Sequence, residues 1–144
     1  MKKILVALDA SERAPQVLAA AIRFAKPLGA KLHLYRSVSI PREIPVDLYI
    51  GEGGNLEVLL VQKSQKELLA FAAGVPAELL EGHHVDVATP WDGICRTAKV
   101  HGAELIVIGS HGYAGFDRLL GTTAAKVVNH AECSVLVVRE GLAP

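Results

Sequence analysis

Neither sign of charge dominates this chain of 144 residues, which has 15 lysines and arginines, 15 aspartates and glutamates, and a formal net charge of zero. It therefore lacks the cationic excess with which proteins bind nucleic acids or anionic membranes. No apolar run reaches membrane-spanning length, and Asp9 ends the first run, at residues 4–8. That run is too short for the hydrophobic region of a signal peptide, so we predict a first strand there and a cytoplasmic location.

Cysteine is also scarce. Only Cys95 and Cys133 are present, without a CxxC motif and without the spacing to a histidine pair that a metal site shows. We therefore predict two reduced, half-buried thiols. Apolar residues, in contrast, are abundant: 51% of the chain is hydrophobic and 21% is charged, a globular composition that fits one domain over residues 1–144.

Short apolar segments recur along the chain. Residues 4–8 and 104–108 are almost continuously apolar, which predicts strands buried on both faces of a sheet. Residues 31–38 and 84–88 alternate between apolar and polar, which predicts strands with one less buried face. A fifth strand is expected at residues 134–138.

Helical patterns separate these strands. The first is expected after a cap at Asp9 or Ser11, with Pro27 and Gly29 stopping it. In the last, after Gly121, we expect Ala125 and Val128 to point inward. The remaining helices are expected at residues 56–73 and 90–101.

Alternation of strand and helix predicts an α/β protein: one open, five-stranded parallel sheet with helices on both faces. The most apolar strands belong at the centre, which favours the order 3-2-1-4-5 and a reversal of winding between strands one and four. Ligands bind outside the carboxyl ends of strands at such a reversal. Asp9 and Gly109 both follow those two strands, so we expect them to meet at one site.

The fifth strand would lie at the edge of this sheet, although residues 135–138 carry no charge, proline or glycine. An apolar edge strand invites pairing with another chain. We therefore predict a homodimer in which residues 134–138 of two copies pair antiparallel about a two-fold axis.

Glycines gather after the fourth strand. Gly109-Ser-His-Gly112 follows the strand, and Gly121-Thr122-Thr123 begins a helix. Glycines let the backbone approach an anion, and the amides of a helix N-terminus bind phosphate. The segment is not a Walker A loop, because it lacks Gly-Lys-Ser/Thr. It is not a dinucleotide fingerprint either, because the glycines follow strand four and not strand one.

These segments together resemble the universal stress protein family, and in particular its ATP-binding branch. The signature of that branch, Gly-x2-Gly-x9-Gly-Ser/Thr, is similar to residues 109–122. The opening residues 3–11, Leu32-His-Leu34 and the closing residues 130–139 also resemble the family. The resemblance implies an adenine-nucleotide alpha-hydrolase-like fold, dimerisation through the last strand and a regulatory role in stress response.

The resemblance also implies a site for ATP, or for AMP or another adenine nucleotide, with Mg²⁺. Asp9 would meet the ribose or the adenine edge, Ser37 or Val38 would line the adenine pocket, and the glycine segments would hold the phosphates. It implies no catalytic residue and no metal held by the protein. The implied binding residues are Ala7, Leu8, Asp9, Ser37, Val38, Ile108, Gly109, Ser110, His111, Gly112, Gly121, Thr122, Thr123 and Ala124.

One spacing departs from the signature. Eight residues separate Gly112 from Gly121, where the family has nine. One residue fewer shifts the helix start by about 3.3–3.6 Å at full extension. Gly115 can absorb this shift, because a flexible residue allows the loop to follow another path.

Several residues have a second interpretation. Asp9 is either a ligand contact or a helix N-cap, and His111 and Arg118 are either phosphate contacts or solvent-facing loop residues. Four further histidines, at the ends of expected strands or helices, are predicted to lie on the surface without binding a metal. They are His83, His84, His101 and His130.

Three functions are compatible with these features. The favoured one is a nucleotide-binding regulatory dimer whose state an unidentified protein partner reads. The second is a slow ATPase, for which no water-activating carboxylate is evident near the glycine segments. The third is a dimeric interaction module that binds no nucleotide.

Overall fold

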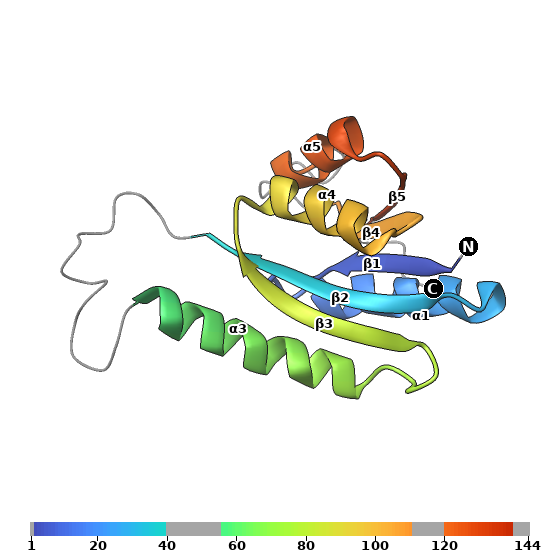
Figure 1. Cartoon of the computed structure of the whole chain (residues 1–144), viewed down its shortest axis with the longest axis horizontal. Helices are drawn as coiled ribbons and strands as arrows, with labels where there is room; N and C mark the ends of the chain where they lie inside the picture. Colours follow the sequence, from blue (N-terminus) through green and yellow to red (C-terminus); the bar gives the residue numbers. More distant parts are fainter. Residues whose placement is uncertain (1, 40–55, 111–119, 140–144) are drawn as a thin grey trace.

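The computed structural model describes residues 2–39, 56–110 and 120–139. Its strands form one parallel sheet in the order β3-β2-β1-β4-β5, which confirms the order expected from strand hydrophobicity (Figure 1). The central strands are the continuously apolar ones, and the edges are the third and fifth. The strands are β1 (Lys3–Ala7), β2 (Lys31–Val38), β3 (Leu80–Val87), β4 (Leu105–Gly109) and β5 (Ser134–Val138).

Helices cover both faces of the sheet (Figure 1). Residues of α1 (Ala14–Leu28) and α3 (Leu56–Ala73) share one apolar cluster with alternate residues of β1, β2 and β4. Residues of α4 (Pro90–His101) and α5 (Thr122–His130) share a second cluster with the opposite side chains of the same strands. Ile4 and Leu5 illustrate this division, since consecutive strand residues point to opposite faces.

The entry into α1 differs from the expectation that Asp9 or Ser11 caps the helix. The helix begins at Ala14, and its N-cap position is Arg13, without a side-chain cap. The Asp9 carboxylate instead accepts a hydrogen bond from the Ser11 amide at 3.0 Å, and Ser11 Oγ accepts one from the Arg13 amide at 3.3 Å. Both side chains thus stabilise the turn that precedes the helix, which is a usual role for Asp and Ser.

Pro27 does not stop α1, since it lies inside the last turn of the helix. The helix ends at Gly29, which adopts a left-handed conformation with φ of 62° and donates its amide to the carbonyls of Ala25 and Lys26. Glycine adopts this conformation at little cost, so Gly29 alone supplies the stop signal.

The buried face of α5 also differs from the prediction. Ala124 and Val127 are buried, whereas Val128, expected to point inward, is 46% exposed. Ala125 is half-buried. The helix starts at Thr122, and this start places the i, i+3 pair Ala124 and Val127 toward α4 and the sheet.

Among the described residues, no helix is long and apolar enough to cross a membrane. Cys95 and Cys133 are half-buried free thiols, as predicted, and burial raises the pKa of each.

Candidate functional site

A cavity of about 420 Å³ opens at the carboxyl ends of β1, β2 and β4, where the direction of winding reverses. Side chains from the N-terminal parts of α1, α4 and α5 complete its walls. Its volume falls within the range of small-molecule sites in proteins. The expectation that Asp9 and Gly109 meet at this reversal is correct, because both line the cavity.

Most of the residues implied by the family resemblance lie together in this cavity. Val38 and Ser110 do not line it: the Val38 carbonyl accepts a hydrogen bond from the Ala88 amide, and Ser110 is buried, only 4% exposed. His111 and Gly112 fall outside the described residues, as does Arg118. The lining residues expected from the sequence are Ala7, Leu8, Asp9, Ser37, Ile108, Gly109, Gly121, Thr122, Thr123 and Ala124.

Six further lining residues were not expected. They come from the N-terminal parts of two helices and from the middle of β2, and no role in binding was predicted from the sequence for any of these positions. A charged residue within a buried strand, Arg36, was the one available signal. The six are Ala14, Val17, Tyr35, Arg36, Pro90 and Ile94.

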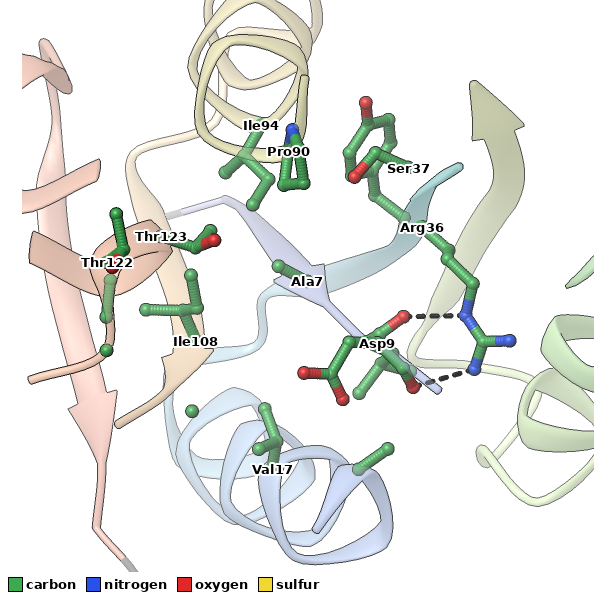
Figure 2. A pocket seen from close by; sticks show the side chains of 16 residues that line it. Ala7, Asp9, Val17, Arg36, Ser37, Pro90, Ile94, Ile108, Thr122 and Thr123 are labelled. Atoms are coloured by element: carbon green, nitrogen blue, oxygen red, sulfur yellow. Dashed lines mark hydrogen bonds between the residues drawn. The ribbon is translucent and has the colours of Figure 1, made fainter. Parts of the chain in front are cut away.

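Figure 2 shows polar groups at two ends of the cavity and apolar side chains between them. Asp9 and Ser37 lie at one end, and Thr122 and Thr123 lie at the other. Pro90 and Ile94 of α4 form one wall, Val17 of α1 faces them, and Ala7 and Ile108 lie along the floor. The described lining thus offers polar groups on two sides of the cavity and an apolar surface between them.

Arg36 fixes the Asp9 end of the cavity. Its Nε donates to the Leu8 carbonyl and its Nη2 donates to the Asp9 carbonyl, each at 2.8 Å (Figure 2). Its Nη1 forms a 2.7 Å ion pair with Glu67 of α3. The residue is only 4% exposed. Because these contacts occupy the guanidinium, Arg36 supports the backbone that carries Asp9 and is poorly placed to bind an anion in the cavity.

The two glycine segments meet at the opposite end. The Ser110 amide donates to the Val138 carbonyl at 2.9 Å, and the Ser110 carbonyl accepts the Gly121 amide at 3.1 Å. This pairing closes the base of the 111–120 segment and places the start of α5 beside the end of β4. The spacing of eight residues is thus compatible with the meeting of Gly109 and Gly121 at the cavity.

The first turn of α5 presents backbone amides at this end. Gly121 occupies the N-cap position without a side-chain cap, and the amides of Thr122, Thr123 and Ala124 donate to no capping acceptor in the described part of the chain. Such amides are donors that an anion can satisfy, and the helix dipole favours negative charge there. The hydroxyls of Thr122 and Thr123 add further donors.

Fold and cavity together define a class, that of open parallel α/β proteins with a ligand-sized cavity at the topological switch point. The chain belongs to the universal stress protein family, since the sequence model of that family matches residues 1–139.

Individual relatives agree with this assignment. The chain is 35% identical to the universal stress protein in the QAH/OAS sulfhydrylase 3' region of Thermus aquaticus, over 96% of this chain and 98% of the relative. It is 31% identical to universal stress protein A homolog 2 of Coxiella burnetii, over 96% and 94% of the two chains.

Solved structures share the fold. The structure of hypothetical protein MJ0577 matches with a TM-score of 0.81 at 25% identity, over 99% of this chain and 98% of the other. A universal stress protein from Archaeoglobus fulgidus, solved in complex with dAMP, matches with a TM-score of 0.64 at 24% identity, over 96% and 98% of the two chains.

Proposed function

We propose that this protein binds an adenine nucleotide, with ATP and Mg²⁺ as the principal ligand, and acts as a nucleotide-dependent regulatory dimer in stress response. The observation that carries the proposal is that one cavity has Asp9 and Ser37 at one end and the N-terminus of α5 at the other. A nucleotide has the matching shape, with a polar nucleoside at one end and anionic phosphates at the other. The existence of a dAMP complex on the same fold supports this choice at the level of the fold.

The nucleoside belongs at the Asp9 end. A carboxylate accepts hydrogen bonds from ribose hydroxyls or an exocyclic amine, and Asp9 points into the cavity there (Figure 2). The apolar side chains of Pro90, Ile94 and Val17 offer a surface for the base. Ser37 at the end of β2 supplies additional polar groups at the same edge.

The phosphates belong at the α5 end, where amides and threonine hydroxyls are the donors. Among the described lining residues Arg36 carries the only cationic side chain, and its guanidinium is engaged elsewhere. The described lining therefore offers no available cation for the phosphates, and we propose that bound Mg²⁺ balances much of their charge. Mg²⁺ is usually held largely through substrate phosphates, and the hydroxyls of Thr122 and Thr123 are the lining side-chain oxygens at that end.

Binding without hydrolysis is the proposed outcome. Asp9 is the one carboxylate among the described lining residues, and it lies at the end opposite Thr122 and Thr123 (Figure 2). A group that positions water must approach the phosphate that is transferred. The bound nucleotide is thus suited to stabilise one state of the protein for a partner to read, since a ligand of the folded state also stabilises the fold.

Asp9→Asn tests the site. Asparagine keeps an oxygen for the Ser11 amide but removes the charge, so we expect ATP–Mg²⁺ affinity to fall about tenfold, the effect of one hydrogen bond to a charged group. Calorimetric titration with ATP–Mg²⁺, ATP without metal and adenosine measures the change. Glu12→Gln, the same chemical change at an exposed neighbour outside the cavity, should alter affinity less than twofold.

The direction of the change is decisive. If Asp9 only stabilised its turn, removing a negative charge near a polyanion would leave ATP binding unchanged or tighten it. Absence of binding heat in the wild type would overturn the proposal outright. If phosphate is released during prolonged incubation with ATP, the proposal of binding without hydrolysis is wrong and the protein is an ATPase.

The dimer is proposed to form through β5. Val135, Leu136, Val137 and Val138 are half-buried within the monomer, and no other strand of the described chain pairs with the outer edge of β5. An antiparallel pairing of two copies would satisfy this edge and cover its apolar side chains.

Val137→Lys is expected to convert a dimer of twice 15.3 kDa into a monomer, because lysine at a paired apolar edge faces like charge across the two-fold axis. Light scattering over a concentration series measures the mass. Val100→Lys makes the same substitution at an 83% exposed site on α4 and should leave the mass unchanged. A wild-type monomer at all concentrations would contradict the dimer.

A further inference from the structure

Three imidazoles from three separate elements meet where β2, β3 and the end of α4 lie together. His33 lies near the start of β2, His84 lies in β3 and His101 is the last residue of α4. The sequence predicted isolated surface histidines, which is wrong for His84 and His101, because both are half-buried against His33. Only the pairing of β2 with β3 and the path of α4 bring the three together.

The contacts within this histidine cluster are close. His33 Nε2 lies 2.8 Å from His84 Nδ1, and one ligating nitrogen from each of the three histidines lies within 4.8 Å of the others. The ring centroids of His33 and His101 are 4.3 Å apart, and those of His84 and His101 are 5.8 Å apart.

Hydrogen bonding inside the cluster is incomplete. The second nitrogen of His33, Nδ1, is buried without a hydrogen-bond partner among the residues that the structure describes. Buried polar atoms of this kind are rare in folded proteins and call for an explanation. Packing alone accounts for the contact of the three rings. It does not account for the unpaired His33 Nδ1 or for the proximity of three groups that can bind a metal.

The cluster has the chemistry of a transition-metal site. Imidazole is the commonest side-chain ligand of such metals, and three imidazoles suffice for a tetrahedral zinc site with one open position.

We infer that His33, His84 and His101 form a binding site for a divalent transition metal, most suitably Zn²⁺, with solvent at the fourth position. Tetrahedral Zn–N bonds of about 2.0–2.1 Å place ligand nitrogens about 3.3–3.4 Å apart, a value between the 2.8 Å contact of His33 with His84 and the 4.8 Å limit of the cluster, so the side chains must adjust to bind the ion. The half-exposed surface of all three residues leaves an entry path for the ion.

Glu81 extends the cluster. Its Oε1 lies 4.0 Å from His101 Nδ1 and 3.8 Å from Lys3 Nζ. A carboxylate beside the second nitrogen of a ligating histidine orients the ring and raises its basicity, which is a common arrangement around zinc. Glu81 would thereby direct His101 Nε2 toward the ion and offset part of its charge.

This site differs from that of the Mg²⁺ proposed for the nucleotide. Imidazole selects zinc, copper or nickel, whereas Mg²⁺ requires oxygen ligands. Pro90 and Ile94 line the cavity and His101 ends the same helix, so the two sites are about 10–16 Å apart along α4 at 1.5 Å per residue, with the ring of Tyr35 between the cavity and His84. The inference does not rest on nucleotide binding, because no ligand of the zinc lines the cavity.

Titration of the untagged full chain with ZnCl₂, without nucleotide, tests the site. We expect one zinc per chain in the micromolar range or tighter, and a visible spectrum of four-coordinate cobalt when Co²⁺ is the probe. His101→Gln, at the accessible end of α4, should weaken zinc binding at least about tenfold, as should His84→Gln. His83→Gln is the matched control, because His83 is exposed and lies outside the cluster.

Circular dichroism of each variant tests whether the fold is intact. His101→Gln is the variant expected to disturb the fold least, because the side chain lies at a helix end. Equal zinc affinity in the wild type and His101→Gln would overturn the site, as would the absence of saturable binding. To exclude the two thiols, the titration is repeated after alkylation of Cys95 and Cys133. Loss of binding on alkylation, with no effect of His101→Gln, would assign the zinc to the cysteines and refute the inference.

Discussion

Replacing Arg36 with methionine is expected to lower the free energy of unfolding by about 3 kcal/mol, although methionine can fill much of the same space. The substitution leaves the carbonyls of Leu8 and Asp9 without their donor and removes the cation paired with Glu67. Each unsatisfied buried group costs about 1–3 kcal/mol, and the partial exposure of Glu67 limits its share. Urea unfolding of the two proteins measures the difference.

Arg23→Met is the matched control, because Arg23 lies exposed on α1 and the same change there should cost less than about 0.5 kcal/mol. Glu67→Gln should cost less than Arg36→Met, since glutamine still accepts a hydrogen bond and the two carbonyls keep their donor. A loss from Arg36→Met no larger than that from Arg23→Met would mean that the buried hydrogen bonds and the ion pair of Arg36 contribute little to stability.

The sequence predicted the strand order but not the contacts of Arg36. Strand order followed from hydrophobicity, because β1 and β4 are buried on both faces and only central strands can be continuously apolar. The meeting of Asp9 with the glycine segments followed from that order. A sequence does not disclose which polar atoms a buried arginine reaches, because Leu8, Asp9 and Glu67 come from two other segments of the fold.

The histidine cluster was hidden for the same reason. Metal motifs are recognised when ligands are close in sequence, whereas His33, His84 and His101 are widely separated and meet only through strand pairing and the course of α4. The face of α5 was misjudged for a local reason. A shift of one residue in phase rotates a helix by about 100°, and this shift exchanges Val127 for Val128 at the core.

Gly93→Ala is the second change with a large expected effect. Alanine normally stabilises a helix relative to glycine by about 1 kcal/mol, yet here we expect a loss of about 2 kcal/mol. A Cβ at Gly93 would lie 2.1 Å from the Tyr35 hydroxyl and 3.0 Å from Ala88 Cβ, and Tyr35 is fully buried. Either the ring or α4 must move.

Tyr35→Phe supplies the test of this cause. The Tyr35 hydroxyl is buried, with Thr97 and Asp86 near it but no hydrogen bond of good geometry among the described residues, and burial together with Asp86 raises its pKa to about 12, so it remains protonated. Phenylalanine removes that atom at little cost. With phenylalanine at position 35, the ring atom nearest to the added Cβ of Gly93→Ala is 3.3 Å away. Gly93→Ala should then lower the free energy of unfolding by less than about 1 kcal/mol.

The double-mutant cycle of Gly93→Ala and Tyr35→Phe should therefore give a coupling of about 1 kcal/mol or more, measured by urea unfolding. Gly74→Ala is the control, because a Cβ there meets only ordinary contact at 3.5 Å and its effect should stay within about 0.5 kcal/mol. Additive effects would show that the hydroxyl is not the obstacle. Because Tyr35 lines the nucleotide cavity and also contacts the ring of His84, with centroids 5.1 Å apart, the ring that Gly93 accommodates is common to both proposed sites.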